Sequence, residues 1–248
     1  MVHLSGEYAV RAPFRGPVTI ERNRRLVAEL TGTALLLTAV VGSGIMAERL
    51  SGGNQAIALL ANSVATGAAL VALILAFGPI SGAHFNPAVT LADASQGGLA
   101  WRDVAGYISV QVLGAVLGVW IAHLMFGERL FMLSLHVRSG ASQVFSEFIA
   151  TFGLLAVIWA CSRRHAATVP FAVAAYITAA YWFTASTSFA NPAVTIARAL
   201  TDTFAGIRPA DVPGFVIGQL LGATAATLMF RWLVPALPNT TSSSQASM

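Results

Sequence analysis

Hydrophobic residues fall into six long stretches separated by short polar segments. A helix needs roughly 20 mostly apolar residues to cross the core of a bilayer. The stretches meet or approach that length, at residues 26–47, 56–78, 104–126, 145–162, 169–187 and 214–234. The pattern therefore predicts an all-α membrane protein with six transmembrane helices.

Two further apolar segments, 86–94 and 191–200, are too short to cross a bilayer. About nine helical residues extend about 14 Å, close to half of a hydrocarbon core roughly 30 Å thick. Both begin with nearly the same heptapeptide, Asn-Pro-Ala-Val-Thr followed by Leu-Ala at 86–92 and by Ile-Ala at 191–197. Corresponding Pro-interrupted segments in two halves are typical of inverted repeats around a transport site. We predict two re-entrant half-helices whose N-termini meet near the membrane centre.

The first residues of each heptapeptide suit a helix start. Asparagine is a favoured N-cap, and proline fits the first helical turn, where its missing N–H costs nothing. An asparagine amide also offers two N–H donors beyond its capping oxygen. We therefore expect the two motifs to donate hydrogen bonds to a solute, with backbone carbonyls of 81–84 and 187–190 lining the same path. The predicted pore motifs are Asn86, Pro87 and Ala88 and Asn191, Pro192 and Ala193.

The chain is predicted to form one channel domain, residues 26–235, built from two repeats. The first repeat covers about 26–126 and the second about 145–235, and each has three crossings, so the second is inverted relative to the first. Residues 1–25 are predicted to be a cytoplasmic tail, and residues 236–248 a disordered one.

Composition and charge support a membrane location. The chain is 56% hydrophobic and 10% charged, and all 14 basic residues are arginines. With the N-terminus inside, nine arginines lie on the cytoplasmic side and five outside, which predicts a multi-pass inner or plasma membrane protein with both termini cytoplasmic. The basic N-terminal segment is interpreted as an orientation signal, not as a nucleic-acid-binding arm. The single cysteine, Cys161, excludes an internal disulfide.

Enzyme and metal chemistry find no support in the sequence. No Cys/His ligand cluster, nucleophile–base pair or glycine-rich phosphate loop lies at membrane depth. We expect no catalytic residue, no metal and no cofactor. A secondary carrier with inverted repeats is the rival transport hypothesis, but carriers bind coupling ions through intramembrane charges, and here only Glu29 and Glu147, at helix starts, offer them.

The segment Ser81–Thr90, the second Asn-Pro-Ala and the paired Glu29 and Glu147 resemble the aquaporin and aquaglyceroporin channels, the major intrinsic protein family. The resemblance implies a pore in each subunit, a homotetramer in the lipid bilayer and small neutral solutes as substrates. It also implies that Glu29 and Glu147 are buried and accept hydrogen bonds from the re-entrant loops. Physical chemistry favours the same role, because an intramembrane carboxylate needs a partner.

Four positions usually set the narrowest point of such channels, among them an arginine directly after the second Asn-Pro-Ala. Val194 stands there in this sequence, and counting back from the motifs assigns the others to Thr66, Ala179 and Ser188. Small side chains predict a widened filter that passes glycerol-like polyols, urea or metalloid acids such as arsenite and methylated arsenicals. A water-selective pore is the alternative.

Two further residues are candidates for the pore or its vestibules. Arg198 lies seven residues after Asn191 and so on nearly the same helix face. It either lines the outer vestibule or pairs with Asp202 at i,i+4, and we favour the pair. His84 lies at the inner mouth, where a hydrogen-bonded structural histidine is favoured over a pH gate. Asp93 is the residue of the first half that matches Arg198, which suggests vestibules of different sign.

Overall fold

The computed structural model describes residues 20–233, and every regular element in that range is helical. Six helices are long and apolar enough to cross a membrane. They are α1 (Arg22–Leu50), α2 (Gln55–Ser81), α4 (Trp101–Phe126), α5 (Ala141–Ser162), α6 (Val169–Phe183) and α8 (Val212–Leu233), where α6 reaches the required length together with the 3₁₀ turn that precedes it. Two short helices, α3 (Pro87–Ser95) and α7 (Pro192–Arg198), and two 3₁₀ turns, η1 (Ala166–Thr168) and η2 (Pro209–Asp211), complete the order. Residues 1–19 of the predicted N-terminal tail (1–25) and the whole predicted C-terminal tail (236–248) lie outside the described residues.

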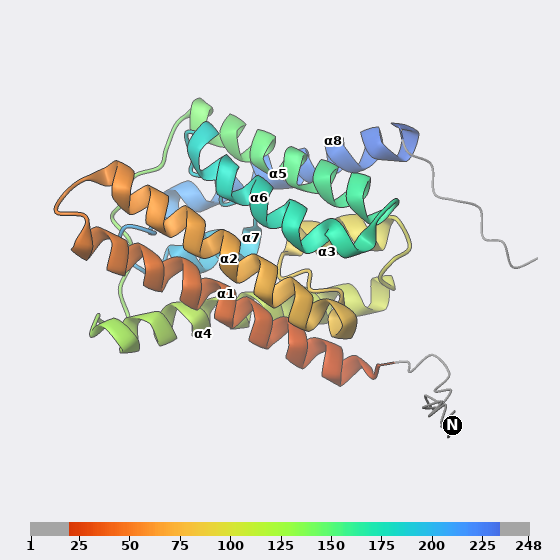
Figure 1. The fold of residues 1–248 in the computed structure, drawn as a ribbon, viewed down its shortest axis with the longest axis horizontal. Coiled ribbons are helices and arrows are strands. Elements are labelled where there is room, and N and C mark those ends of the chain that lie inside the picture. Colours follow the sequence, from red (N-terminus) through yellow and green to blue (C-terminus); the bar gives the residue numbers. More distant parts are fainter. Residues whose placement is uncertain (1–19, 234–248) are drawn as a thin grey trace, which may run out of the picture.

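The long helices lie side by side and surround α3 and α7, as Figure 1 shows. The six predicted crossings and the two half-helices are thus present, with ends shifted by a few residues. The fifth crossing, predicted to reach 187, is shorter at its C-terminal end, because α6 ends at Phe183. Thr187 and Ser188 have φ values of 60° and 50°, a left-handed conformation that a right-handed helix cannot contain.

Glycines bring two helix pairs close together, one in each half. On α4, a side chain added at Gly114 or Gly118 would collide with the backbone carbonyls of Leu30 or Ala34 in α1. On α8, a side chain at Gly222 would meet the carbonyl of Phe148 in α5. Small residues permit such close approach of helices in membranes. The α1–α4 and α5–α8 pairs therefore occupy corresponding places in the two repeats.

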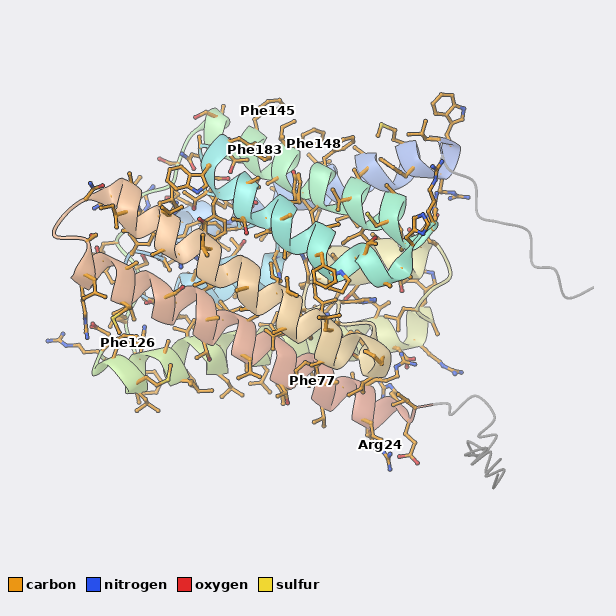
Figure 2. All side chains as sticks on the ribbon, viewed as in Figure 1. Arg24, Phe77, Phe126, Phe145, Phe148 and Phe183 are labelled. Carbon is orange, nitrogen blue, oxygen red and sulfur yellow. The ribbon has the colours of Figure 1, made fainter. Side chains whose placement is uncertain are left out.

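Large apolar side chains point outward over the long helices, as Figure 2 shows for Phe145 on α5 and Phe183 on α6. Both side chains are exposed on the isolated chain. In a soluble protein so much exposed apolar surface would be unfavourable, whereas in a bilayer it contacts lipid tails or another subunit. The polar side chains of the interior are instead concentrated around α3 and α7.

Candidate functional site: a pore between the two half-helices

Each half-helix begins at its asparagine. The Asn86 side-chain oxygen accepts a hydrogen bond from the Ala88 N–H at 2.9 Å, and that of Asn191 accepts from the N–H groups of Ala193 at 3.0 Å and Val194 at 3.3 Å. Proline follows each cap in the first turn. The local sequence therefore dictates where both helices start, as capping rules require.

The same asparagines also connect the two halves. The Asn86 amide donates to the carbonyl of Ala190 at 2.8 Å, and the Asn191 amide donates to the carbonyl of Phe85 at 2.7 Å. Each amide nitrogen carries two N–H groups, so one donor per asparagine remains. Both side chains line a common cavity, and the reciprocal bonds fix their orientation toward it.

The loops that precede α3 and α7 have an unusual backbone. Ala83, Phe85 and Ala190 each have φ near +49°, where a non-glycine residue is strained. Such a conformation persists only where surrounding contacts hold it. Residues 81–85 and 188–190 lie along the cavity.

Two buried carboxylates hold these loops. Glu29 on α1 accepts hydrogen bonds from the N–H groups of His84 at 2.9 Å and Phe85 at 2.8 Å. Glu147 on α5 accepts from Phe189 at 2.9 Å and Ala190 at 2.8 Å. Both glutamates are fully buried and make no ion pair with an arginine of the described chain. Backbone donors satisfy their charge in place of a cation.

Two glutamines that the sequence analysis did not single out complete this arrangement. Gln111 on α4 donates to Glu29 at 2.8 Å and to the hydroxyl of Thr90 at 2.9 Å. Gln219 on α8 donates to Glu147 at 2.6 Å, and to the hydroxyl of Thr195 at 2.8 Å. A polar residue at matching depth in the third crossing of each repeat is the signal that could have pointed to them.

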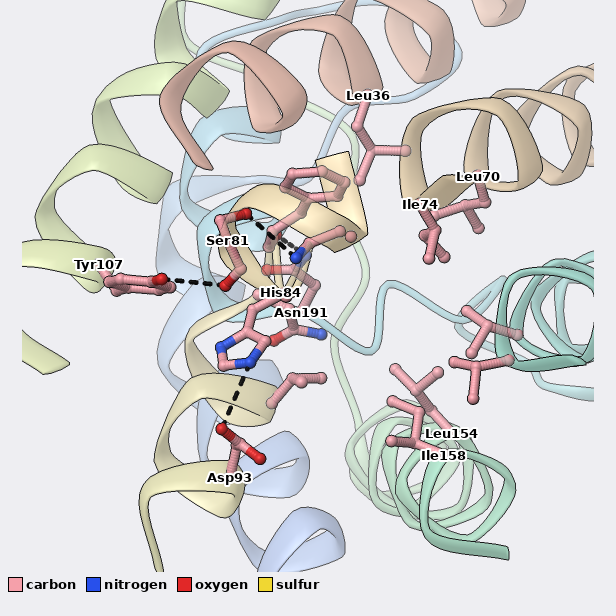
Figure 3. A pocket seen from close by; sticks show the side chains of 18 of the residues that line it. Leu36, Leu70, Ile74, Ser81, His84, Asp93, Tyr107, Leu154, Ile158 and Asn191 are labelled. Atoms are coloured by element: carbon pink, nitrogen blue, oxygen red, sulfur yellow. Dashed lines mark hydrogen bonds and ion pairs between the residues drawn. The ribbon is translucent and has the colours of Figure 1, made fainter. Parts of the chain in front are cut away.

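The cavity has a volume of about 890 Å³ and passes both asparagines. Figure 3 shows Asn191, His84 and Asp93 on one side, and the apolar side chains of α2 and α5 on the other. The apolar wall is formed by residues that include Leu70, Ile74, Leu154 and Ile158. The path therefore has a polar stripe facing a hydrophobic wall.

The predicted filter needs one correction. Thr66, Ser188 and Val194 line the cavity, but Ala179 does not, because it lies on the exposed face of α6. Tyr181, two residues later, lines the cavity instead, and its hydroxyl lies 3.2 Å from that of Thr66. The count back from Asn191 was wrong because it could not place the end of α6 within the irregular loop that follows.

The favoured Arg198–Asp202 pair was also wrong. Arg198 is only 2% exposed; its Nε donates to the carbonyl of Ala205, and its guanidinium lies 3.4 Å from the centre of the Phe189 ring. Asp202 accepts instead from the N–H of Leu135 at 2.8 Å. Arg198 lines the cavity, as the less favoured alternative proposed.

His84 lies at the other end of the cavity in a bonded environment. Its Nδ1 is 3.2 Å from the Thr90 hydroxyl, and its Nε2 is 3.5 Å from a carboxylate oxygen of Asp93 (Figure 3). The ring centre lies 5.6 Å from that of Tyr107. These contacts are those of a structural histidine, although its ring also borders the path.

The loop before α5 contributes an arginine that the sequence analysis did not single out. Arg138 donates to the carbonyls of Gly206 at 2.8 Å and Ser186 at 3.3 Å, so it ties the loop before α5 to the segments on either side of α7. Burial lowers the pKa of Arg138 to about 10, so that it still carries its charge at neutral pH. In the sequence, the only signal for Arg138 is its position in the loop between the third and fourth predicted crossings.

The family model described as "Major intrinsic protein" matches this chain over residues 18–170 and 163–248. The chain belongs to the major intrinsic protein family. The aquaglyceroporin AqpS of Rhizobium meliloti is 57% identical over 87% of this chain and 92% of its own length. The aquaporin NIP1-4 of Oryza sativa subsp. japonica is 31% identical over 84% of this chain and 76% of its own.

The fold agrees with that assignment. The aquaglyceroporin of Plasmodium falciparum superimposes with a TM-score of 0.66 at 20% identity, covering 87% of this chain and 98% of the other. This major intrinsic protein is a multi-pass membrane channel for small solutes and not an enzyme.

Proposed function

We propose that this channel passes small neutral polar solutes larger than water: glycerol-like polyols, urea and metalloid acids such as arsenite or methylated arsenicals. The observation that carries the proposal is Val194. It lines the cavity directly after the second Asn-Pro-Ala, where the family resemblance implies an arginine. A valine there is shorter and uncharged, so it leaves room for a solute wider than water.

The two-sided wall of the path supports a polyol-like substrate. The carbons of such a solute contact the apolar side, near Leu70 and Leu154, while its hydroxyls bond to the amides of Asn86 and Asn191. A polar solute that lost its hydration without such replacement would face a large desolvation cost. The printed name of the 57% identical relative, an aquaglyceroporin, points to the same substrate class.

A water-selective pore is the second candidate, and one observation favours it. Tyr181 brings an aromatic ring to the cavity beside Thr66, where the sequence had suggested only small side chains. The aromatic side chain of Tyr181 narrows the path, whereas Val194 widens it. Measurements of solute transport decide between a water-selective pore and a pore for larger solutes.

The test is stopped-flow light scattering of proteoliposomes with water, glycerol, urea and arsenous acid. We expect the wild type to pass the larger solutes, and Val194→Arg to reduce their flux about tenfold or more while retaining water flow. Val194→Met, which adds length without charge, is the matched variant and separates width from charge. Wild-type vesicles that pass water but none of the three solutes would refute the proposal in favour of a water pore.

We further propose a homotetramer in the inner or plasma membrane with both termini in the cytoplasm. Support comes from the arginine bias and from the exposed face of α6, where Ala175, Ala179 and Phe183 are available to a second subunit. Native mass spectrometry in detergent tests the tetramer. Fusions of fluorescent protein and periplasmic phosphatase to the C-terminus test the orientation; an active phosphatase fusion contradicts it.

A further inference from the structure

The two ends of the cavity are built from corresponding residues that differ in charge. His84 at the inner end corresponds to Phe189 at the outer end, and Asp93 corresponds to Arg198. In both cases the corresponding residues are 105 positions apart, the spacing that also separates the two pore asparagines. At the inner end the His84 Nε2 lies 3.5 Å from a carboxylate oxygen of Asp93 (Figure 3). At the outer end the Arg198 guanidinium lies 3.4 Å from the centre of the Phe189 ring. The inverted repeat thus places a carboxylate at one end and a guanidinium at the other.

Arg198 is held rigidly while its charge stays available to the path. The guanidinium lies over the Phe189 ring, 3.4 Å from its centre, and Nε donates a hydrogen bond to the carbonyl of Ala205. The two terminal guanidinium nitrogens have no hydrogen-bond partner in the described residues. They are nevertheless not completely buried. Since Arg198 lines the cavity, those nitrogens reach the space through which solutes pass.

No opposite charge in residues 20–233 neutralises Arg198 directly. None of the ion pairs there includes it, and the buried Glu147 is occupied by the N–H groups of Phe189 and Ala190. Arg138, the other buried guanidinium at this end, lies 5.1 Å from the Phe189 ring and uses its donors on loop carbonyls. An arginine keeps its proton in proteins, so the outer end carries a fixed positive charge.

We infer that Arg198 is the residue that excludes cations at the outer end of the cavity, one helical turn beyond Val194. In this arrangement Val194 sets the width of the path, and Arg198 excludes cations without narrowing it at the valine. The inference rests on the channel function but not on which neutral solute is carried. It assigns charge selectivity and size selectivity to two different residues of the same half-helix.

Urea and guanidinium separate the two properties, because they are planar and of similar size but differ by one charge. The entry of urea and the entry of guanidinium into proteoliposomes are measured separately at zero membrane potential. Proton entry is followed in parallel with a pH-sensitive dye inside the vesicles. A unit charge about 10 Å from the permeating ion, at an effective dielectric constant near 20, changes its population roughly tenfold.

We expect wild-type vesicles to exclude guanidinium and protons. Arg198→Gln keeps a donor for the Ala205 carbonyl but removes the charge; its guanidinium and proton entry should rise about tenfold while neutral-solute flux persists. Arg198→Lys should keep the barrier. Arg129→Gln removes an exposed cation of the outer loop outside the cavity, and it should resemble the wild type.

Two results overturn the inference: an Arg198→Gln channel that transports neutral solute yet admits no more cations than wild type, or an Arg198→Lys channel that leaks as much as Arg198→Gln. If Arg198→Gln transports nothing, Arg198→Met supplies the same comparison. Wild-type vesicles impermeable to glycerol, urea and arsenous acid would contradict the proposed substrate class instead, and proton entry then still tests the barrier.

Discussion

At the scale of single residues, the carboxylates of the interior act as acceptors for backbone and not as charges for ions. Glu29 accepts four hydrogen bonds, from two backbone N–H groups, the Ser81 hydroxyl and the Gln111 amide. An ionised carboxylate carries no hydrogen, so its two oxygens can accept all four of these bonds. The strained conformation of the re-entrant loop depends on this acceptor.

Glu29→Gln should therefore destabilise the channel although it changes the shape very little. One oxygen becomes an NH₂ group that faces other donors, which costs about 3 kcal/mol when the group is buried. We expect a clearly lower melting temperature in detergent and reduced solute flux. Glu48→Gln, an exposed position of the same helix, is the control and should leave both unchanged. Equal melting temperatures of the two variants would contradict the bonding role of Glu29.

His136, in the loop between α4 and α5, gives the stability a pH dependence of known sign. Partial burial lowers the pKa of His136, and the charges of Arg138 and Arg198 lower it further. The unfolded chain, with a histidine pKa near 6.5, then binds the proton more readily than the folded one. The folded state is favoured fully above about pH 6.5 and loses this contribution as the pH falls through that value.

The measurement is the melting temperature of the wild type and of His136→Asn between about pH 8 and 5. We expect the wild type to lose more stability than the variant as the pH falls, because the variant has no such proton to bind. Parallel curves for the two proteins would show that His136 does not contribute. The comparison cancels the titration of all other groups.

At the scale of helices, the close α5–α8 contact makes a sharp prediction for Gly222. A methyl group at this position would meet the carbonyl of Phe148, which belongs to the backbone and cannot move aside. We expect Gly222→Ala to lower the melting temperature by several degrees. Gly78→Ala is the matched helical control, since nothing lies within 4 Å of an added Cβ there. A variant at 222 as stable as that at 78 would disprove the close contact.

The helices were predictable from sequence because hydropathy and capping are local properties. The face that each helix turns toward the cavity could not be predicted in the same way. Ala179 and Tyr181 are two residues apart, and only the irregular path of the following loop decides which of them faces the cavity. The role of Gln111 was equally hidden, because its partner Glu29 is 82 residues away. Two environments were compatible with the position of Arg198, the vestibule and a pair with Asp202, and in the structure Arg198 packs against Phe189.

At the scale of the whole molecule, the inverted repeat gives one path with two similar halves and different ends. Glu29 with Gln111 and Glu147 with Gln219 repeat the same support on both sides of the membrane centre. Nothing in that arrangement requires the protein to change shape for a solute to pass, since the cavity already runs past both asparagines. A carrier, by contrast, must alternate between states and so saturates.

Flux measurements therefore distinguish the two classes of transporter without any mutation. We expect the initial rate of glycerol entry to rise in proportion to the concentration difference, with no plateau and no dependence on sodium or proton gradients. Entry and exit under equal gradients should have the same permeability coefficient, because the charges of Asp93 and Arg198 change the free-energy profile of a neutral solute along the path but not the equality of its two ends. Saturation at millimolar concentration, or uptake driven by an ion gradient, would identify a carrier and overturn the single open path inferred from the cavity.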